Sequence, residues 1–395
     1  MKPFVLGRPV ALCAVAWLCA SSLAVAQGAP AQTRPPVTFV FTSDAHFGLT
    51  RGRFRGAEQV DAAVVNAALV AAINALPDAT FPRDGGLGAG ERIGALEAVI
   101  EGGDIANRAE NGVQPAQRSW SQFDSVYRHG LHTRTGGGAM TPLWMVPGNH
   151  DASNAIGFYR PLLGGPDAVS MMAIYNAMMR PATPVSASTY HYDRDRVHYT
   201  RDIAGVHVLF LHIWPDSTER AWMDRDLRTL PPGTPALIFT HDQPDVEAKH
   251  FRNPHGQGDI NEQDRFENLL TERLQGGGEA TAADASTEYE QRMLAAFLKD
   301  HPAIQGYFHG NSNGHEFYTY GGPDHDLSLP TFRVDSPMKG DHSAADERLL
   351  SFMVITLAAD GRSLTARECL WNAGADGVSW GETRTIPLYR TVGTP

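Results

Sequence analysis

Gly148-Asn149-His150-Asp151 is the stretch whose residue types and spacing could do the most chemistry. It follows the apolar run 143–147, so an amide oxygen, an imidazole and a carboxylate stand on one turn at the end of an expected strand. These groups bind divalent metals and move protons, which suits a metal-assisted hydrolase. Gly-Asn is also ordinary turn chemistry, so the motif gains its weight from similar residues elsewhere in the chain.

Four further apolar runs stop at Asp, His or Asn. Because α/β sheets build their sites at the carboxyl ends of strands, we expect these residues to meet at one place. The run 37–43 delivers Asp44 and His46, the run 99–101 leads to Asp104, the run 236–240 ends at His241, and the run 304–308 ends at His309 and Asn311.

This set and its order resemble the calcineurin-like metallophosphoesterases, whose pattern is D-x-H, G-D, G-N-H-D/E, a lone His and G-H-x-H. The resemblance extends from about Val37 to Asn311. Its last motif departs from the pattern, because Phe308 stands for the first Gly and Asn311 for the final His. The resemblance implies an α/β fold of two packed mixed β-sheets flanked by helices, a four-layer αββα sandwich.

The same resemblance implies two divalent metal ions as cofactors. Oxygen and nitrogen ligands without Cys suit manganese, iron, zinc or cobalt better than a structural zinc. His315, four residues beyond Asn311, is an alternative to Asn311 as the last ligand. In the family's arrangement the first ion would be held by Asp44, His46, Asp104 and Asn311, and the second by the bridging Asp104 with Asn149, His241 and His309.

His150 resembles the family histidine that contacts the phosphoryl group and stabilises or protonates the leaving oxygen. Asp151 would orient it through a carboxylate–imidazole hydrogen bond. Asn107 and Arg108 follow Asp104 closely enough to reach a substrate. Arg108 could clamp a phosphate with two hydrogen bonds, and a solvated surface arginine is an equal interpretation.

The leading hypothesis is an exported, dinuclear-metal-dependent phosphoric ester hydrolase, which attacks phosphorus with a metal-bridging hydroxide. Its substrate would be a small-molecule phosphate ester, with monoesters slightly favoured. A phosphodiesterase or nucleotidase with the same site is the alternative among enzymes. A catalytically weak phosphate-ligand binding protein is the alternative from another class, because Asn311 replaces a histidine.

The first residues predict a secretory signal peptide over 1–26. Lys2 and Arg8 precede an apolar stretch, and Ala24-Val25-Ala26 is a small-residue cleavage pattern. We therefore expect a periplasmic or secreted protein with no membrane contact after cleavage. Cys369 would be the only cysteine of the mature chain, so an intramolecular disulfide is excluded there and a packed core must provide stability.

The formal net charge of −11 makes general binding to nucleic acid or to an anionic membrane improbable, because phosphate backbones demand basic patches. The length fits one large α/β unit, so a single calcineurin-like domain is expected over 37–395. A composition rich in Gly, Asn, Asp and Glu predicts a lid or insertion at about 249–293.

Hydrophobic spacing predicts the remaining elements. The last two expected strands are joined by Asp360-Gly361 as a hairpin. Helices are expected over 57–76, 119–131 and 221–230, and strands over 191–199, 207–213, 349–357 and 363–371.

Overall fold

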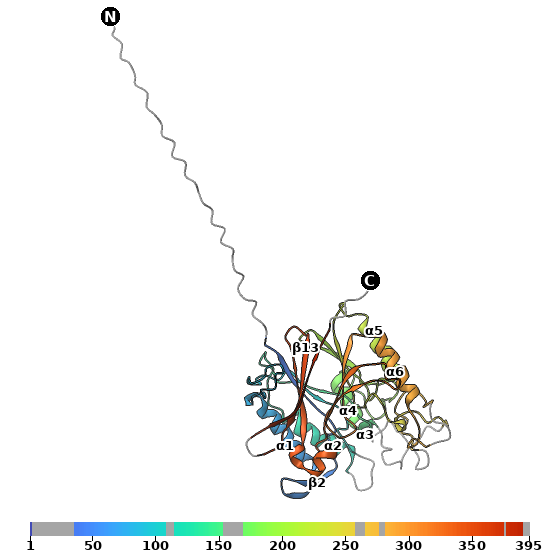
Figure 1. Cartoon of the computed structure of the whole chain (residues 1–395). Coiled ribbons are helices and arrows are strands. Elements are labelled where there is room, and N and C mark those ends of the chain that lie inside the picture. Colours follow the sequence, from blue (N-terminus) through green and yellow to red (C-terminus); the bar gives the residue numbers. More distant parts are fainter. Residues whose placement is uncertain are drawn as a thin grey trace. The chain divides into compact units, whose positions relative to one another are not determined.

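Two six-stranded mixed sheets form the framework of the structure, which is a computed structural model (Figure 1). The first contains, in spatial order, β14 (Ser379–Pro387), β13 (Ser363–Leu370), β12 (Ser351–Leu357), β1 (Val37–Thr42), β4 (Val99–Glu101) and β5 (Leu143–Met145). The second contains β10 (Glu316–Tyr320), β11 (Leu329–Arg333), β9 (Ile304–His309), β8 (Ala236–Phe239), β7 (Val206–Phe210) and β6 (Tyr199–Ile203).

The structure describes Met1 and residues 35–107, 114–152, 169–256, 265–275, 281–374 and 377–389. Apart from Met1, the expected signal peptide 1–26 lies outside the described residues, and so does Arg108. Pro35–Pro395 form one compact unit and Met1–Arg34 a separate one. None of the helices in the described ranges is long and apolar enough to cross a membrane.

Each sheet contains a block of neighbouring parallel strands. In the first sheet β1, β4 and β5 are parallel, and in the second β7, β8, β9 and β11 are. The loops that leave the carboxyl ends of parallel strands gather at one edge, which is where such folds place their sites. The other neighbouring strands in both sheets pair antiparallel.

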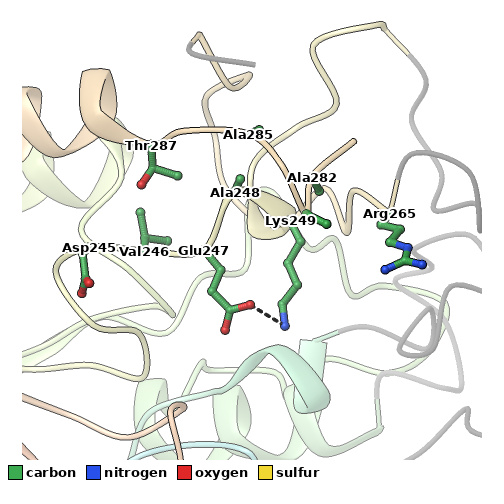
Figure 2. Close-up of a pocket in the computed structure, with 10 residues that line it drawn as sticks. Asp245, Val246, Glu247, Ala248, Lys249, Arg265, Ala282, Ala285 and Thr287 are labelled. Atoms are coloured by element: carbon green, nitrogen blue, oxygen red, sulfur yellow. Dashed lines mark ion pairs between the residues drawn. The ribbon is translucent and has the colours of Figure 1, made fainter. Parts of the chain in front are cut away.

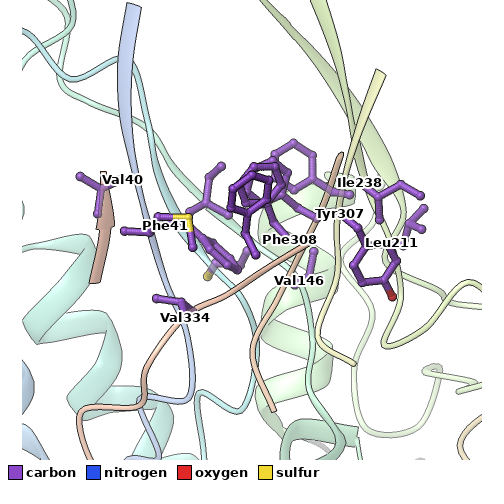
Figure 3. Packing of buried hydrophobic residues seen from close by; sticks show 14 of the residues in the cluster. Val40, Phe41, Val146, Leu211, Ile238, Tyr307, Phe308 and Val334 are labelled. Atoms are coloured by element: carbon purple, nitrogen blue, oxygen red, sulfur yellow. The ribbon is translucent and has the colours of Figure 1, made fainter. Parts of the chain in front are cut away.

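Aromatic side chains pack the two sheets against each other (Figure 3). The ring of Phe41 in β1 meets that of Phe239 in β8 edge to face at 5.2 Å, and Phe239 stacks on Phe308 in β9 at 4.5 Å. All three rings are fully buried. Burying such a side chain contributes roughly 1.5–3 kcal/mol, so this contact fixes the distance between the two strand edges that carry the site.

Helices flank the sheets. In Figure 1, α5 and α6 lie beside each other, away from α1. Helix α1 begins where the Asp61 carboxylate accepts the Ala63 N–H at 2.7 Å, and its buried face includes Val65, Leu69 and Ile73. The helices are α1 (Ala62–Ala75), α2 (Ala116–Phe123), α3 (Asn149–Ala152), α4 (Val169–Met179), α5 (Ser217–Leu227), α6 (Glu288–Asp300) and α7 (Asp341–Ala345).

The predicted architecture of two packed mixed sheets with flanking helices is confirmed, and some elements are corrected. The expected helix over 57–76 begins only at Ala62, because residues 57–61 form β3 (Ala57–Asp61), which pairs with β2 (Thr50–Phe54). The expected strand over 191–199 is wrong, since turns occupy it until β6 begins at Tyr199. The expected C-terminal hairpin is β12 and β13, and β14 extends it.

Candidate metal centre

Asp104 lies between two histidines that come from different sheets. Its Oδ2 is 3.7 Å from Nε2 of His46, which follows β1, and its Oδ1 is 3.3 Å from Nε2 of His241, which follows β8. His46 Nε2 is also 3.6 Å from Asp44 Oδ1. A carboxylate whose two oxygens face opposite partners is the arrangement required of a bridging ligand.

Among the residues that the structure describes, two groups of side chains could each hold a metal ion, because the ligand atoms of each group lie within 4.8 Å of one another. One consists of Asp44, Asp104 and His241, and the other of His46, Asp104 and His150. Asp104 belongs to both groups, whereas Asp44 and His46, which were expected on the same ion, belong to different groups. His150, expected to contact substrate only, stands in ligand position as well, since its Nε2 is 3.8 Å from Asp104 Oδ2.

Several polar atoms at this place are buried without a hydrogen-bond partner among the described residues. They are Asp44 Oδ1 and both ring nitrogens of His46. An unsatisfied buried polar group costs about 1–3 kcal/mol, so three together would be a large defect in a purely structural turn. Divalent cations fit this donor set of carboxylate and imidazole groups, and they would satisfy these atoms.

Four candidate site residues have a backbone in the left-handed region. The φ angles are 59° for Asp44, 43° for His46, 54° for Asp104 and 60° for Asn311. Such a conformation costs about 1–2 kcal/mol for a residue with a side chain. Hydrogen bonds from Asp44 N to Gly103 O at 2.9 Å and from Asn311 N to Asp44 Oδ2 at 3.0 Å hold the loops in this shape.

Two glycines allow the loops to approach the carboxylates closely. A Cβ atom on Gly148 would overlap Asp104 Oδ1, and one on Gly310 would overlap Asp44 Oδ2 and Ser43 Oγ. The first glycine of the Gly148-Asn149-His150-Asp151 turn is therefore required by the close approach of Asp104. Two residues after Gly148, His150 donates its backbone N–H to Asp104 Oδ1 at 2.8 Å.

His241 and Asn149 are oriented by their outer hydrogen bonds. His241 Nδ1 lies 2.8 Å from the carbonyl oxygen of Gly102, which turns Nε2 toward Asp104 and to 3.3 Å from Asn149 Oδ1. Asn149 Nδ2 donates to Glu267 Oε2 at 3.4 Å, so the amide presents its oxygen to His241. A partner on the far nitrogen of a histidine is how proteins fix the tautomer that binds a metal.

Charge coupling between Asp104 and the histidines is strong. Burial opposes the charged form of Asp104, yet His241 and then His150 and His46 hold the pKa of its carboxyl well below the usual value. Burial likewise opposes a charged His241, yet Asp104 raises the pKa of this imidazole well above its usual value. Without a metal ion, the protonated His241 provides the positive charge next to Asp104. A bound cation would provide that charge instead and displace the proton.

Asp151 does not make the hydrogen bond to His150 that the sequence led us to expect. Among the described residues its carboxylate accepts three backbone N–H groups, those of Ile105 and Gly148 at 3.1 Å and that of Ala106 at 2.9 Å. Asp151 therefore ties the loop that carries Asp104 to the turn that carries His150. The turn geometry is the reason, since it points this carboxylate back at the preceding strand ends.

The last motif differs most from the expectation. His309 lies outside both metal groups of the described residues, with Nδ1 3.0 Å from Gly310 O and Nε2 2.9 Å from the Tyr318 hydroxyl. Burial lowers the pKa of His309 to about 3, so the ring is neutral. Asn311 Nδ2 donates to Gln243 at 3.1 Å and to Glu247 at 3.2 Å. Ligation by His309 or by the Asn311 side chain stays a prediction.

His315, the alternative to Asn311, faces another part of the molecule. Its Nε2 lies 3.6 Å from Glu368 in β13 and 3.4 Å from Glu382 in β14. Burial lowers the pKa of this imidazole to about 4. His315 is therefore away from the two groups formed around Asp104.

The structure places Asn107 beside His150, together with Lys339, a residue that the sequence analysis missed. Lys339 Nζ is 3.3 Å from Asn107 Oδ1 and 3.3 Å from His150 Nε2. Lys339 follows β11, a strand that the hydrophobic pattern did not predict, so the sequence offered no signal for this residue. Glu267 and Glu247 were missed too, because no motif marks either residue.

A pocket of about 420 Å³ lies next to Asn311. Figure 2 shows Glu247 and Lys249 side by side in its wall, and their charged groups are 2.7 Å apart. Burial opposes the charged form of Glu247, but His250 and Lys249 lower the pKa of its carboxyl to about 2. Part of the expected lid over 249–293 therefore lines this pocket, with Arg265, Ala282, Ala283, Ala285 and Thr287.

Comparison with known proteins gives matches among solved structures alone. Neither protein-family models nor curated protein sequences match the chain. A dimetal phosphatase from Danio rerio is 11% identical with a TM-score of 0.50, and the alignment covers 90% of this chain and 100% of that chain. The calcineurin-like phosphoesterase YfkN from Bacillus subtilis is 11% identical with a TM-score of 0.30, covering 90% and 91%.

The phosphopantetheinyl hydrolase PptH from Mycobacterium tuberculosis is 11% identical with a TM-score of 0.32, covering 77% of this chain and 91% of that chain. At such identities the likeness to the dimetal phosphatase shows the fold. The chain therefore has the fold of this dimetal phosphatase, in agreement with the predicted fold class, and its described residues form two candidate metal groups at the strand ends.

Proposed function

We propose that the protein is an exported, metal-dependent phosphoesterase that hydrolyses small phosphate monoesters. The observation that carries the proposal is the position of Asp104, whose two oxygens face His46 and His241 across the two sheets. Buried Asp44 and His46 atoms without hydrogen-bond partners among the described residues support the same proposal. When bound there, divalent ions supply positive charge near the phosphoryl group and activate water.

The chain's own residues orient the reaction. His150 lies beside Asp104 and His46, and its ring centre is 4.9 Å from that of His46. Burial lowers the pKa of His150 well below its usual value, and Lys339 acts in the same direction. We therefore assign His150 to hydrogen bonding with the phosphoryl group, because a neutral imidazole is a poor donor of a whole proton. His150→Ala removes one hydrogen-bond donor to the phosphoryl group and is expected to slow turnover by roughly 10²–10³-fold.

The test is hydrolysis of p-nitrophenyl phosphate and of bis(p-nitrophenyl) phosphate by the purified protein with added manganese. Metal content is measured by mass spectrometry on the same samples. We expect metal-dependent hydrolysis that favours the monoester and stops after exhaustive chelation. Turnover that persists in metal-free protein would contradict the proposal.

Export is tested separately. Cell fractionation should recover the protein outside the cytoplasm, and its mass should correspond to a chain that begins at Gln27. A full-length chain in the cytoplasmic fraction would contradict export and leave the enzymatic proposal standing.

One observation favours a second candidate, a phosphate-ligand binding protein with weak catalysis. The Tyr318 hydroxyl and the Gly310 carbonyl occupy both ring nitrogens of His309. Unless this ring turns, the ion expected near His241 has one ligand fewer than the family pattern implies. Phosphate binding without hydrolysis of either ester would identify this second function.

A further inference from the structure

Next to the proposed metal centre, three nitrogen-bearing side chains converge. They are Lys339, the buried Asn107 and His150. Asn107 is fully buried, its Oδ1 accepts from Lys339, and its Nδ2 has no hydrogen-bond partner among the described residues. The buried N–H₂ group of Asn107 therefore lacks an acceptor among the described residues, and it lies beside an ammonium.

The backbone around Lys339 is fixed to the site. The hydroxyl of Ser336 accepts the backbone N–H of Lys339 at 2.9 Å and donates to the carbonyl oxygen of Asp44 at 2.9 Å. Ser336 is fully buried. One hydroxyl group therefore connects the lysine turn to the end of β1, and the ammonium is held at a fixed place relative to Asp44.

Lys339 is distinguished from Lys249 by its charge partners. The ammonium of Lys249 pairs with Glu247 at 2.7 Å. Within the described residues Lys339 makes no ion pair with a carboxylate, and its contacts are an amide oxygen and an imidazole nitrogen. A partly buried ammonium without an anion, in a chain with a net charge of −11, is available to a negatively charged ligand.

We propose that Lys339, with Asn107, binds an oxygen of the substrate's phosphoryl group and selects phosphate monoesters over diesters. The inference rests on the proposed phosphoesterase function. The physical reason is charge, because a phosphate monoester carries a second negative charge near neutral pH, which a diester lacks. The ammonium of Lys339 makes a charge-assisted hydrogen bond that is stronger with the doubly charged monoester, whereas the neutral Asn107 amide can donate to either ester.

The experiment compares wild type with Lys339→Met, Lys339→Gln and Lys339→Arg. Lys299→Met is the matched control, because Lys299 pairs with Asp326 at 2.5 Å on the surface and its loss also removes one positive charge. We measure kcat/KM for the mono- and bis-p-nitrophenyl esters, the Kd for inorganic phosphate by calorimetry and the metal content. The phosphate titration does not depend on turnover.

In Lys339→Met and Lys339→Gln, phosphate affinity and the monoester-to-diester ratio should each fall about tenfold, with unchanged metal content. Lys339→Arg should retain most of the phosphate affinity and most of the monoester-to-diester ratio, and Lys299→Met should match wild type.

The inference is wrong, and the proposed function stands, if wild type hydrolyses the esters and the Lys339 variants keep the wild-type ratio and phosphate affinity. Loss of metal from the Lys339 variants would also refute it, by making Lys339 a structural residue. A wild type that neither hydrolyses the esters nor binds phosphate would remove both proposals.

Discussion

Asn311 is, with Phe308, one of the two positions at which the last motif of this chain departs from the family pattern. Its backbone N–H binds the Asp44 carboxylate, and its side-chain amide donates to Gln243 and Glu247. A neutral amide is a weaker donor to a transition metal than an imidazole. Asn311 therefore lies next to the Asp44 carboxylate, as a ligand would, while its side-chain amide hydrogens are bound by Gln243 and Glu247.

Replacing Asn311 with histidine should strengthen metal binding. In Asn311→His, Glu247 can accept a hydrogen bond from one ring nitrogen and leave the other for the ion, so metal affinity should rise about tenfold. His315→Ala should leave metal affinity unchanged, since Glu368 and Glu382 are its neighbours. Calorimetric metal titration of both variants is the measurement. A site lost in His315→Ala would show that His315 is a ligand.

At the scale of elements, the expected lid contributes to the site. Glu267 accepts from Asn149 Nδ2 at 3.4 Å, and His250 Nδ1 lies 2.6 Å from Asp242 Oδ2, next to His241. Both contacts join the stretch after β8 to the turns at the strand ends. The segment therefore orients Asn149 and contacts the residue next to His241, and it also lines a pocket.

This orientation can be tested at Glu267. Glu267→Ala should weaken metal binding about 10–100-fold, because the Asn149 amide loses the partner that turns its oxygen to His241. Glu267→Gln keeps an acceptor oxygen, so its metal affinity should fall much less. Metal titration measures the loss of affinity, and thermal unfolding of the same variants shows whether they also lose stability. Equal losses in both variants would mean that the charge of Glu267, rather than its hydrogen bond, matters.

The sequence predicted the strand ends well, because a buried strand followed by Asp or His is a local pattern. Asp44, Asp104 and His241 are each found where such a run stops, and the two oxygens of Asp104 lie near His46 and His241. The partners of those residues were less predictable. Asp151 binds backbone N–H groups and Lys339 reaches Asn107 across the sheet edge, which are contacts set by tertiary packing.

Elements were misjudged for a related reason. The stretch 57–61 has helical spacing, yet it pairs with β2 as a hairpin. Helix α1 begins only after it, because Asp61 caps the first turn of the helix. Strands β10 and β11 were not predicted at all. Their pairing joins Glu316 to Arg333, residues whose charge hides a strand in a hydrophobicity pattern.

At the scale of the whole molecule, Asp335 should make stability depend on pH. It is buried near Arg51, and burial raises the pKa of its carboxyl to about 7. Between its unfolded pKa of about 4 and pH 7 the folded state holds a proton that the unfolded state has lost, so stability falls as pH rises. The free energy of unfolding should drop by roughly 2–3 kcal/mol from pH 5 to pH 8 through this group.

Urea unfolding of metal-free protein at both pH values is the measurement. Asp335→Asn should reduce the pH dependence, because the amide is neutral throughout. Asp360→Asn, in the exposed turn between β12 and β13, is the control and should keep the wild-type dependence. An unchanged slope in Asp335→Asn would show that Asp335 is ionised in the folded protein.

The pairing of β1 with β12 sets the order of events during biosynthesis. Thr38 in β1 and Thr356 in β12 are neighbours in the sheet, although 318 positions separate them. The strand that delivers Asp44 therefore has an open side until nearly the whole chain has left the ribosome. Closing so long a loop is slow, so we expect the first sheet to be completed only after residue 357 has been made. Such a delay would agree with the export proposed above, because a protein that crosses a membrane in an extended form has to fold afterwards.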